Sequence, residues 1–309
     1  MDRVFVVALT IGVLSRIIML NLDKKQYPTQ PNLILTQMVL AFVASALGAL
    51  VVPALIAKSY TSITFLSLAA EQFRKVRENR RDSLQNLEDI QLVKRGSAFI
   101  EEIARTYEVR NYMCILTSFM TIALHYLLIK DFNFTSNVSL TVSAIFGIAL
   151  ALVMKKLLTR KSIEDIADVR EVKISFVDEF IMQVGDLKGI TNVGLESERE
   201  RYLSKGVGIE IIPKDKNYTN ASILYDPGQR QAIVYNIYSR MGLLREDDEP
   251  AFVPLPRRNP KNESIILAYI PIERDPQKVI QAIKSCPILS SAKGKNLSIK
   301  YKIGEKGSV

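Results

Sequence analysis

Four long apolar stretches constrain this chain more than any other feature. They cover Val4–Leu20, Leu33–Ala57, Tyr112–Ile129 and Val138–Leu158, and Arg16 is the charged residue that lies in the interior of one of them. A bilayer core about 30 Å thick requires about 20 apolar residues in helical form. The sequence therefore predicts four transmembrane helices. We expect the first to be retained, because Arg16 interrupts it and no small-residue cleavage motif follows.

The distribution of Lys and Arg predicts the orientation in the membrane. Ten of them lie in Lys58–Arg110 and twenty-six follow Met154, whereas residues 21–32 carry two and residues 130–137 carry one. The positive-inside rule places the two basic parts, and with them both termini, on the cytoplasmic side of a cell membrane. The net charge of +9 is spread along the chain. We therefore expect a lipid bilayer as neighbour and no nucleic acid partner.

The cysteine and histidine content excludes several kinds of site. Cys114 and Cys286 lie far apart in the sequence, and His125, the only histidine, lies inside the third apolar stretch. A soluble Ser-His-Asp or Cys-His catalytic site is therefore excluded, as is a soluble metal site that uses histidine. We expect no metal and no cofactor, and we expect His125 to be hydrogen-bonded between helices.

The segment between the second and third apolar stretches predicts a cytoplasmic helical hairpin over residues 58–110. Apolar residues at helical spacing from Ile63 to Ile90 predict that its first arm is a long helix. The middle of this arm is strongly basic. Two interpretations stay open, a solvated helix face or a surface that faces anionic lipid headgroups or an acidic partner. The basic candidates are Arg74, Lys75, Arg77, Arg80 and Arg81.

The second arm of the predicted hairpin begins after Gly96-Ser97, which we expect to break the chain and cap a helix. The arm then continues directly into the third apolar stretch. A narrow apolar stripe, which we expect to pack on the preceding helix, consists of Phe99, Ile100, Ile103, Ala104 and Tyr107.

The letters of this arm also carry a family resemblance. "GSAFIEEIA" resembles the Y-I-E-G-I-A motif of the YIEGIA family, membrane proteins of spore-forming bacteria, and "QYPTQPN", "EVRNYM" and "DPGQRQAI" are similar to the family as well. The resemblance implies a membrane location and a link to sporulation, but it implies no reaction. The chain departs from the motif at Phe99 and Glu102, where the family has tyrosine and glycine. The corresponding segment is Phe99, Ile100, Glu101, Glu102, Ile103 and Ala104.

After the fourth stretch the pattern changes to that of a soluble α/β (α+β) domain. We therefore divide the chain into a transmembrane domain, residues 1–158, and a cytoplasmic domain, residues 159–309. Alternating apolar residues predict a hairpin around Asp178-Glu179. Further strands are expected at 207–213, 221–225, 263–271 and 297–303, and helices at 196–205, 230–244 and 275–286. Asp275 and Pro276 suit the N-cap and first position of the last helix.

One turn in this domain has the pattern of a ligand site. Residues 222–233 read as a strand, a tight turn and a helix N-terminus, whose amides and dipole suit an anion. The motif is not a phosphate loop, and an ordinary capped turn explains it as well. The candidates are Asp226, Gly228, Gln229 and Arg230. The segment that follows, residues 245–260, places an acidic block before a basic, proline-rich one. We expect a surface loop there, and a partner-binding or lid segment stays open as the alternative.

Two functions from different classes fit these observations. In the first, four spans anchor a cytosolic regulatory or interaction domain that binds a protein partner. In the second, the protein is a membrane-tethered peptidase with a carboxylate-based site in the cytosolic domain, for which Asp226 is the weak candidate. The lack of histidine and of metal motifs favours the first.

Overall fold

The computed structural model describes residues 2–26, 31–214, 218–244 and 254–293. The chain forms two compact units, one of residues 1–83 and 103–159 and the other of residues 84–102 and 160–309. Helices α3 (Tyr60–Asn86) and α4 (Ser97–Lys130) each contribute residues to both units. Residues 84–102, part of the expected hairpin, are thus packed with the second unit.

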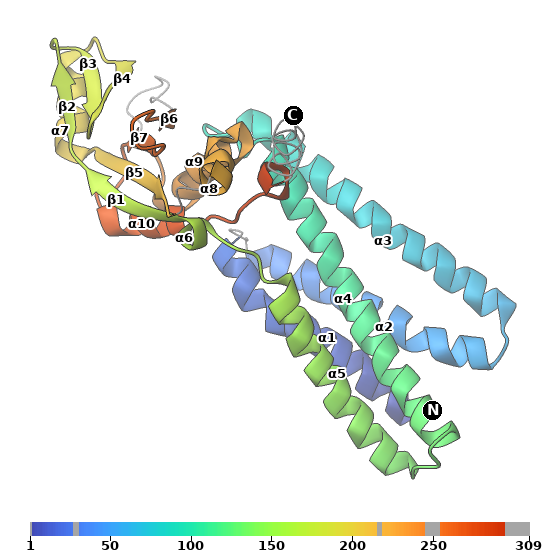
Figure 1. Ribbon diagram of the computed structural model, residues 1–309. Helices are drawn as coiled ribbons and strands as arrows, with labels where there is room; N and C mark the ends of the chain where they lie inside the picture. Colours follow the sequence, from blue (N-terminus) through green and yellow to red (C-terminus); the bar gives the residue numbers. More distant parts are fainter. Residues whose placement is uncertain (1, 27–30, 215–217, 245–253, 294–309) are drawn as a thin grey trace, which may run out of the picture. The chain divides into compact units, whose positions relative to one another are not determined.

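The first unit is a group of long helices (Figure 1). It contains α1 (Asp2–Gln26), α2 (Pro31–Ile56) and α5 (Ser136–Leu158), together with most of α3 and α4. Four of the five, α1, α2, α4 and α5, are long and apolar enough to cross a membrane. The four apolar helices predicted from the sequence are therefore confirmed as helices.

Small residues let these helices approach closely. A Cβ added at Gly48 would lie 2.2 Å from the carbonyl oxygen of Ile115, so only glycine fits where α2 meets α4. Hydroxyl groups add contacts between helices. Ser118 donates to the carbonyl of Ser45 at 2.7 Å, and Ser139 lies 3.0 Å from Nδ1 of His125. The expectation that His125 is hydrogen-bonded between helices is confirmed.

The second unit combines two antiparallel sheets with short helices. The larger sheet has the order β1-β5-β7-β6, and the smaller has the order β2-β3-β4. The strands are β1 (Ala167–Val172), β2 (Ile174–Val177), β3 (Ile181–Val184), β4 (Leu187–Asn192), β5 (Val207–Pro213), β6 (Arg257–Arg258) and β7 (Ile265–Tyr269). The helical elements are η1 (Glu88–Ile90), α6 (Ile163–Ile166), α7 (Glu196–Lys205), α8 (Tyr218–Tyr225), α9 (Pro227–Met241) and α10 (Pro276–Lys284).

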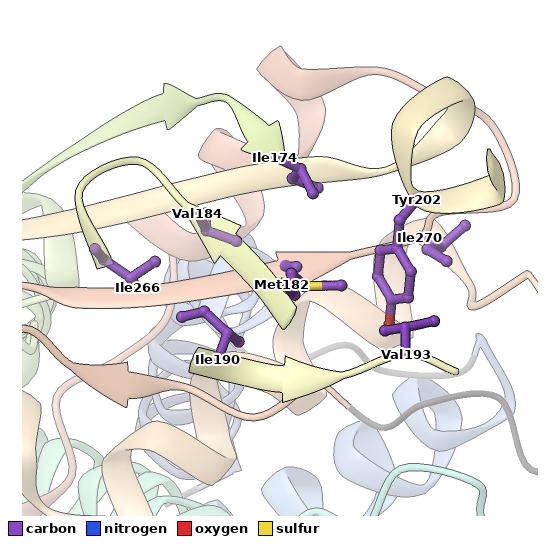
Figure 2. Close-up of a cluster of buried hydrophobic side chains, with 9 residues drawn as sticks. Ile174, Met182, Val184, Ile190, Val193, Tyr202, Ile266 and Ile270 are labelled. Atoms are coloured by element: carbon purple, nitrogen blue, oxygen red, sulfur yellow. The ribbon is translucent and has the colours of Figure 1, made fainter. Parts of the chain in front are cut away.

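One core of this unit lies where the small sheet meets α7 and β7 (Figure 2). Met182 of β3 is fully buried there, and Tyr202 of α7 is 4 % exposed. Burial raises the pKa of Tyr202 to about 12, and the nearby carboxylate of Glu198 adds to the shift. The other labelled residues in Figure 2 are Ile174, Val184, Ile190, Val193, Ile266 and Ile270.

Several local predictions are confirmed. The β2–β3 hairpin turns at Asp178 and Glu179, which both have positive φ. Helix α7 ends before Gly206, and Asp275 caps α10 by accepting a hydrogen bond from the amide of Lys278 at 3.0 Å. The strands expected at 207–213 and 263–271 are β5 and β7.

Other predictions were wrong or lie outside the described residues. The expected strand at 221–225 is the end of helix α8, with Ala221 and Leu224 buried on one side. A short apolar run does not distinguish a strand from a helix. Strands β1 and β4 were not predicted. The expected strand at 297–303 and residues 245–253 of the expected surface loop lie outside the described residues.

Candidate functional site

The turn that was singled out as an anion site lies at the start of α9. Asp226 is the N-cap, and its Oδ1 accepts a hydrogen bond from the amide of Gln229 at 3.1 Å. Asp226 is buried, with only 5 % of the residue exposed. This is the capping arrangement that satisfies a free amide of the first helical turn.

The two other polar candidates of this turn, Gln229 and Arg230, are hydrogen-bonded to the protein backbone. Gln229 is fully buried, donates to the carbonyl of Pro287 at 3.1 Å and accepts from the amide of Leu289 at 2.8 Å. Arg230 donates from Nη1 to the carbonyl of Pro256 at 3.2 Å, while its buried Nε makes no hydrogen bond with the described residues. These contacts favour the capped turn, and the anion site stays a prediction. The peptidase alternative stays a prediction as well.

The YIEGIA-like segment, defined here as Phe99–Ala104, lies at the beginning of α4. Phe99 is fully buried, and its ring contacts that of Tyr235 of α9 edge to face, with 6.0 Å between the centroids. Ile100 is also buried. Phe99 therefore contacts an aromatic ring of α9, which the sequence did not predict, while its packing on the preceding helix stays a prediction.

The loop before α4 is held by one carboxylate. Glu88 accepts hydrogen bonds from the amides of Arg95 and Gly96, at 2.8 and 3.0 Å. Gly96 has a φ of 82°, a conformation that glycine adopts without strain. The Arg95 guanidinium then lies over the ring of Tyr235, 4.7 Å from its centroid. Burial raises the pKa of Tyr235, and Arg95 opposes that rise.

Glu102, which stands where the family motif has glycine, is buried at 3 % exposure. Its carboxylate forms an ion pair with Arg160 and accepts a hydrogen bond from the amide of Ser290 at 3.0 Å. Arg160 also donates to the Ser290 hydroxyl at 3.1 Å. The position of Arg160 follows from a short antiparallel pairing, in which the amide of Ile288 donates to the carbonyl of Lys161. We call Glu102, Arg160 and Ser290 the Glu102 triad.

A pocket of about 640 Å³ lies beside the start of α4. It is lined by polar residues and by the apolar side chains of Leu92 and Ile100. Leu92 of its lining is 42 % exposed, and two apolar residues that are close to the lining residues in sequence are exposed as well, Leu87 at 41 % and Ile90 at 80 %. Such an exposed apolar group is typical of a surface that binds another protein.

The basic residues of α3 do not share one environment. Lys75 and Arg81 are exposed, whereas Arg77 forms an ion pair with Glu108 of α4 at 3.4 Å. The Arg80 guanidinium lies over the ring of Tyr107, 5.0 Å from its centroid. The side chain of Arg74 lies outside the described residues. Of the four basic side chains that the structure describes here, those of Arg77 and Arg80 therefore contact α4.

The part of the chain that the structure describes contains no group of three His, Cys, Asp or Glu residues that could hold a metal ion. Cys286 is fully buried, and burial raises the pKa of its thiol to about 12. A thiol in this environment stays protonated and is a poor nucleophile.

Sequence reasoning did not find the partners of the YIEGIA-like segment. In the sequence Arg160 is only one of the twenty-six Lys and Arg residues that follow Met154, and Ser290 and Tyr235 belong to no motif. One feature could have led to them. Glu102 lies three residues after Phe99, beside the apolar stripe, and a carboxylate that is buried in this way needs a cation and hydrogen-bond donors.

Comparison with known proteins agrees with the resemblance in the sequence. The family model described as YIEGIA protein matches residues 4–299. A protein of Bacillus subtilis (strain 168), described as uncharacterized protein YphB, is 32 % identical over 287 residues, which cover 91 % of this chain and 90 % of the relative. No solved structure matches the chain. The chain belongs to the YIEGIA family.

Proposed function

We propose that the protein is a multi-pass protein of the cell membrane, with both termini in the cytoplasm, and that its second unit is a cytosolic regulatory or interaction domain. One observation carries this proposal. Helix α4 is continuous, and its first turn supplies Phe99, Ile100 and Glu102 to the second unit, while the rest is an apolar helix of the first. A change in the packing of the apolar helices would therefore act on residues that the second unit needs for its own fold.

The pocket beside α4 supports a protein partner. Its mixed lining, which includes Glu88, Lys94 and Ile100, and the exposed Leu87, Ile90 and Leu92 together resemble the apolar centre and polar rim of a protein interface. The pocket lies next to the YIEGIA-like segment, so a bound partner would contact the beginning of α4. The link with sporulation is part of the proposal and rests on the family resemblance.

A membrane assay tests the first part of the proposal. The tagged protein is expected in the membrane fraction after extraction with alkaline carbonate, and reporters fused to either terminus are expected to report a cytoplasmic position. Release of the protein into the soluble fraction, or a terminus on the outer side, would contradict this part.

Site-directed photo-crosslinking in cells tests the second part. A photo-reactive amino acid at Ile90 is expected to give a crosslinked adduct that mass spectrometry can identify. The matched control places the same group at Lys188, which is exposed on β4 of the same unit. Equal adducts at both positions, or none at Ile90, would argue against a partner at this surface.

A further inference from the structure

Arg80 of α3 is an arginine in an unusual environment. Its Nε is buried and makes no hydrogen bond with any residue that the structure describes. Among the described contacts, the Arg80 guanidinium lies over the face of the Tyr107 ring, 5.0 Å from its centroid. An aromatic ring occupies the face of a guanidinium and leaves the N–H groups in its plane available to an oxyanion.

A second guanidinium lies near the same ring, and further buried polar residues lie on the same side of α4. The guanidinium of Arg16, a residue only 2 % exposed, lies 5.9 Å from the centroid of Tyr107 and donates to Oε1 of Gln37 at 2.5 Å. Arg110 and Asn111 lie three and four residues beyond Tyr107, so they share its side of α4. Both are buried, at 2 % and 4 % exposure. We call these residues the Tyr107 cluster: Arg16, Gln37, Arg80, Tyr107, Arg110 and Asn111.

Asn111 supplies the second independent observation. Its Nδ2 is buried and has no hydrogen-bond partner among the described residues. A buried amide group that lacks an acceptor destabilises the fold, so such groups are normally satisfied. The donors without an acceptor in this cluster, Nε of Arg80 and Nδ2 of Asn111, both require an oxygen atom that carries lone pairs.

The nearby carboxylate is already engaged. Glu108 forms its ion pair with Arg77 and accepts a hydrogen bond from the Tyr112 hydroxyl at 3.2 Å. An oxyanion would therefore satisfy donors that Glu108 does not reach in the structure. Phosphate groups suit such a site, because their oxygen atoms accept several hydrogen bonds from guanidinium and amide donors.

We propose that the Tyr107 cluster binds a phosphate-bearing anion, with Arg80 and Asn111 as its principal donors. The ligand is either the headgroup of an anionic phospholipid or free phosphate. The lipid source rests on the proposed membrane location, since Arg16 lies near the end of an apolar stretch and Tyr107 lies just before another, where headgroups are found.

Thermal unfolding of the full-length protein in a non-ionic detergent tests this site. Melting temperatures are measured against added phosphatidylglycerol, phosphatidylcholine or inorganic phosphate, for the wild type and for Arg80→Gln, Asn111→Ala and Arg81→Gln. Arg81→Gln is the matched control. It removes the same charge at the next residue, whose side chain is exposed and pairs with Asp82. Each variant is compared with its own anion-free melting temperature, so a change in basal stability does not obscure the result.

We expect phosphatidylglycerol to raise the melting temperature of the wild type and of Arg81→Gln at the same concentration. Arg80→Gln and Asn111→Ala are expected to need at least about tenfold more lipid, because a hydrogen bond to a charged group contributes that much to binding. A matching rise with inorganic phosphate would identify free phosphate as sufficient and would still support the site.

Two results would overturn the site. One is an equal response of Arg80→Gln and Arg81→Gln, which would indicate general charge attraction. The other is an equal rise with phosphatidylcholine and no rise with phosphate. If the protein fractionates with membranes, either of these two results would overturn the anion site and leave the proposed function intact. If the protein does not fractionate with membranes but phosphate still raises its melting temperature, the proposed location and the lipid source are overturned. The anion site itself then stands.

Discussion

At the scale of single residues, Glu102 shows how one buried charge can tie distant parts of a chain together. Replacing Glu102 with glutamine leaves Arg160 without its carboxylate in a partly buried position. Breaking a buried ion pair costs about 3–5 kcal/mol, and the 22 % exposure of the Arg160 side chain reduces this. We expect Glu102→Gln to lower the stability of the second unit by about 2 kcal/mol.

Thermal unfolding of the full-length protein measures this effect, with Glu164→Gln as the control on an exposed carboxylate. A double-mutant cycle with Arg160→Gln should then show that the two changes are not additive. Equal melting temperatures for Glu102→Gln and Glu164→Gln would show that the pair contributes nothing. Glu102→Gly, which restores the family motif, should destabilise at least as much, because glycine also weakens a helix.

Glu210 of β5 leads to a second prediction at this scale, which concerns how stability depends on pH. Burial alone raises the pKa of its carboxyl, but hydrogen bonds from Ser264, Asn262 and Arg170 outweigh burial and hold the pKa below its usual value. A carboxyl whose pKa is lower in the folded state contributes stability above its unfolded pKa and loses it as the pH falls through the folded value. We therefore expect the wild type to lose stability below about pH 4.5 more steeply than Glu210→Gln. Parallel curves of melting temperature against pH would contradict this.

The scale of elements shows which parts of the fold the sequence could predict. Elements with their own local chemistry were predictable, such as α10 with its Asp275-Pro276 start and the β2–β3 hairpin with its turn at Asp178-Glu179. Helix α8 was not, because a short apolar run of this kind suits either state until its neighbours are known.

The candidate sites follow the same division. The Asp226 cap was predictable from local sequence, whereas the Glu102 triad joins residues that are far apart in the sequence. No local pattern links Glu102 with Arg160. The environment of Arg80 was equally hidden, since Arg80 and Arg81 are alike in sequence and only packing separates them.

The contact between the starts of α4 and α9 gives a prediction at the scale of elements. A Cβ added at Gly228 would lie 2.8 Å from Cβ of Ala98 and 3.0 Å from Oδ1 of Asp226. Gly228→Ala should therefore destabilise by about 1–3 kcal/mol through overpacking. Gly194→Ala is the control, because nothing lies within 4 Å of a Cβ at that position. Adding Ala98→Gly to Gly228→Ala should restore part of the lost stability, and the absence of any rescue would show that these two elements do not meet at this point.

At the scale of the whole molecule, the second unit is discontinuous in sequence. Residues 84–102 belong to it, yet the apolar part of α4 and helix α5 separate them in the sequence from residues 160–309. A fragment of residues 160–309 alone would expose the surface of Tyr235 that Phe99 covers and leave Arg160 without Glu102. A fusion of residues 84–102 to residues 160–309 through a short Gly/Ser linker would restore both, and the contact between Glu102 and Arg160 shows that the ends to be joined lie close together.

We expect this fusion to be soluble and to unfold cooperatively at a higher temperature than residues 160–309 alone, because burial of Phe99 and Ile100 each contributes about 1.5–3 kcal/mol. Circular dichroism during heating measures the difference. The control is the same fusion with Phe99→Ser and Ile100→Ser, which keeps the length and the linker but removes the apolar contact. If the control and the intact fusion melted at the same temperature, the YIEGIA-like segment would have no part in the fold of the second unit. Helix α4 would then not link the apolar helices to the fold of that unit.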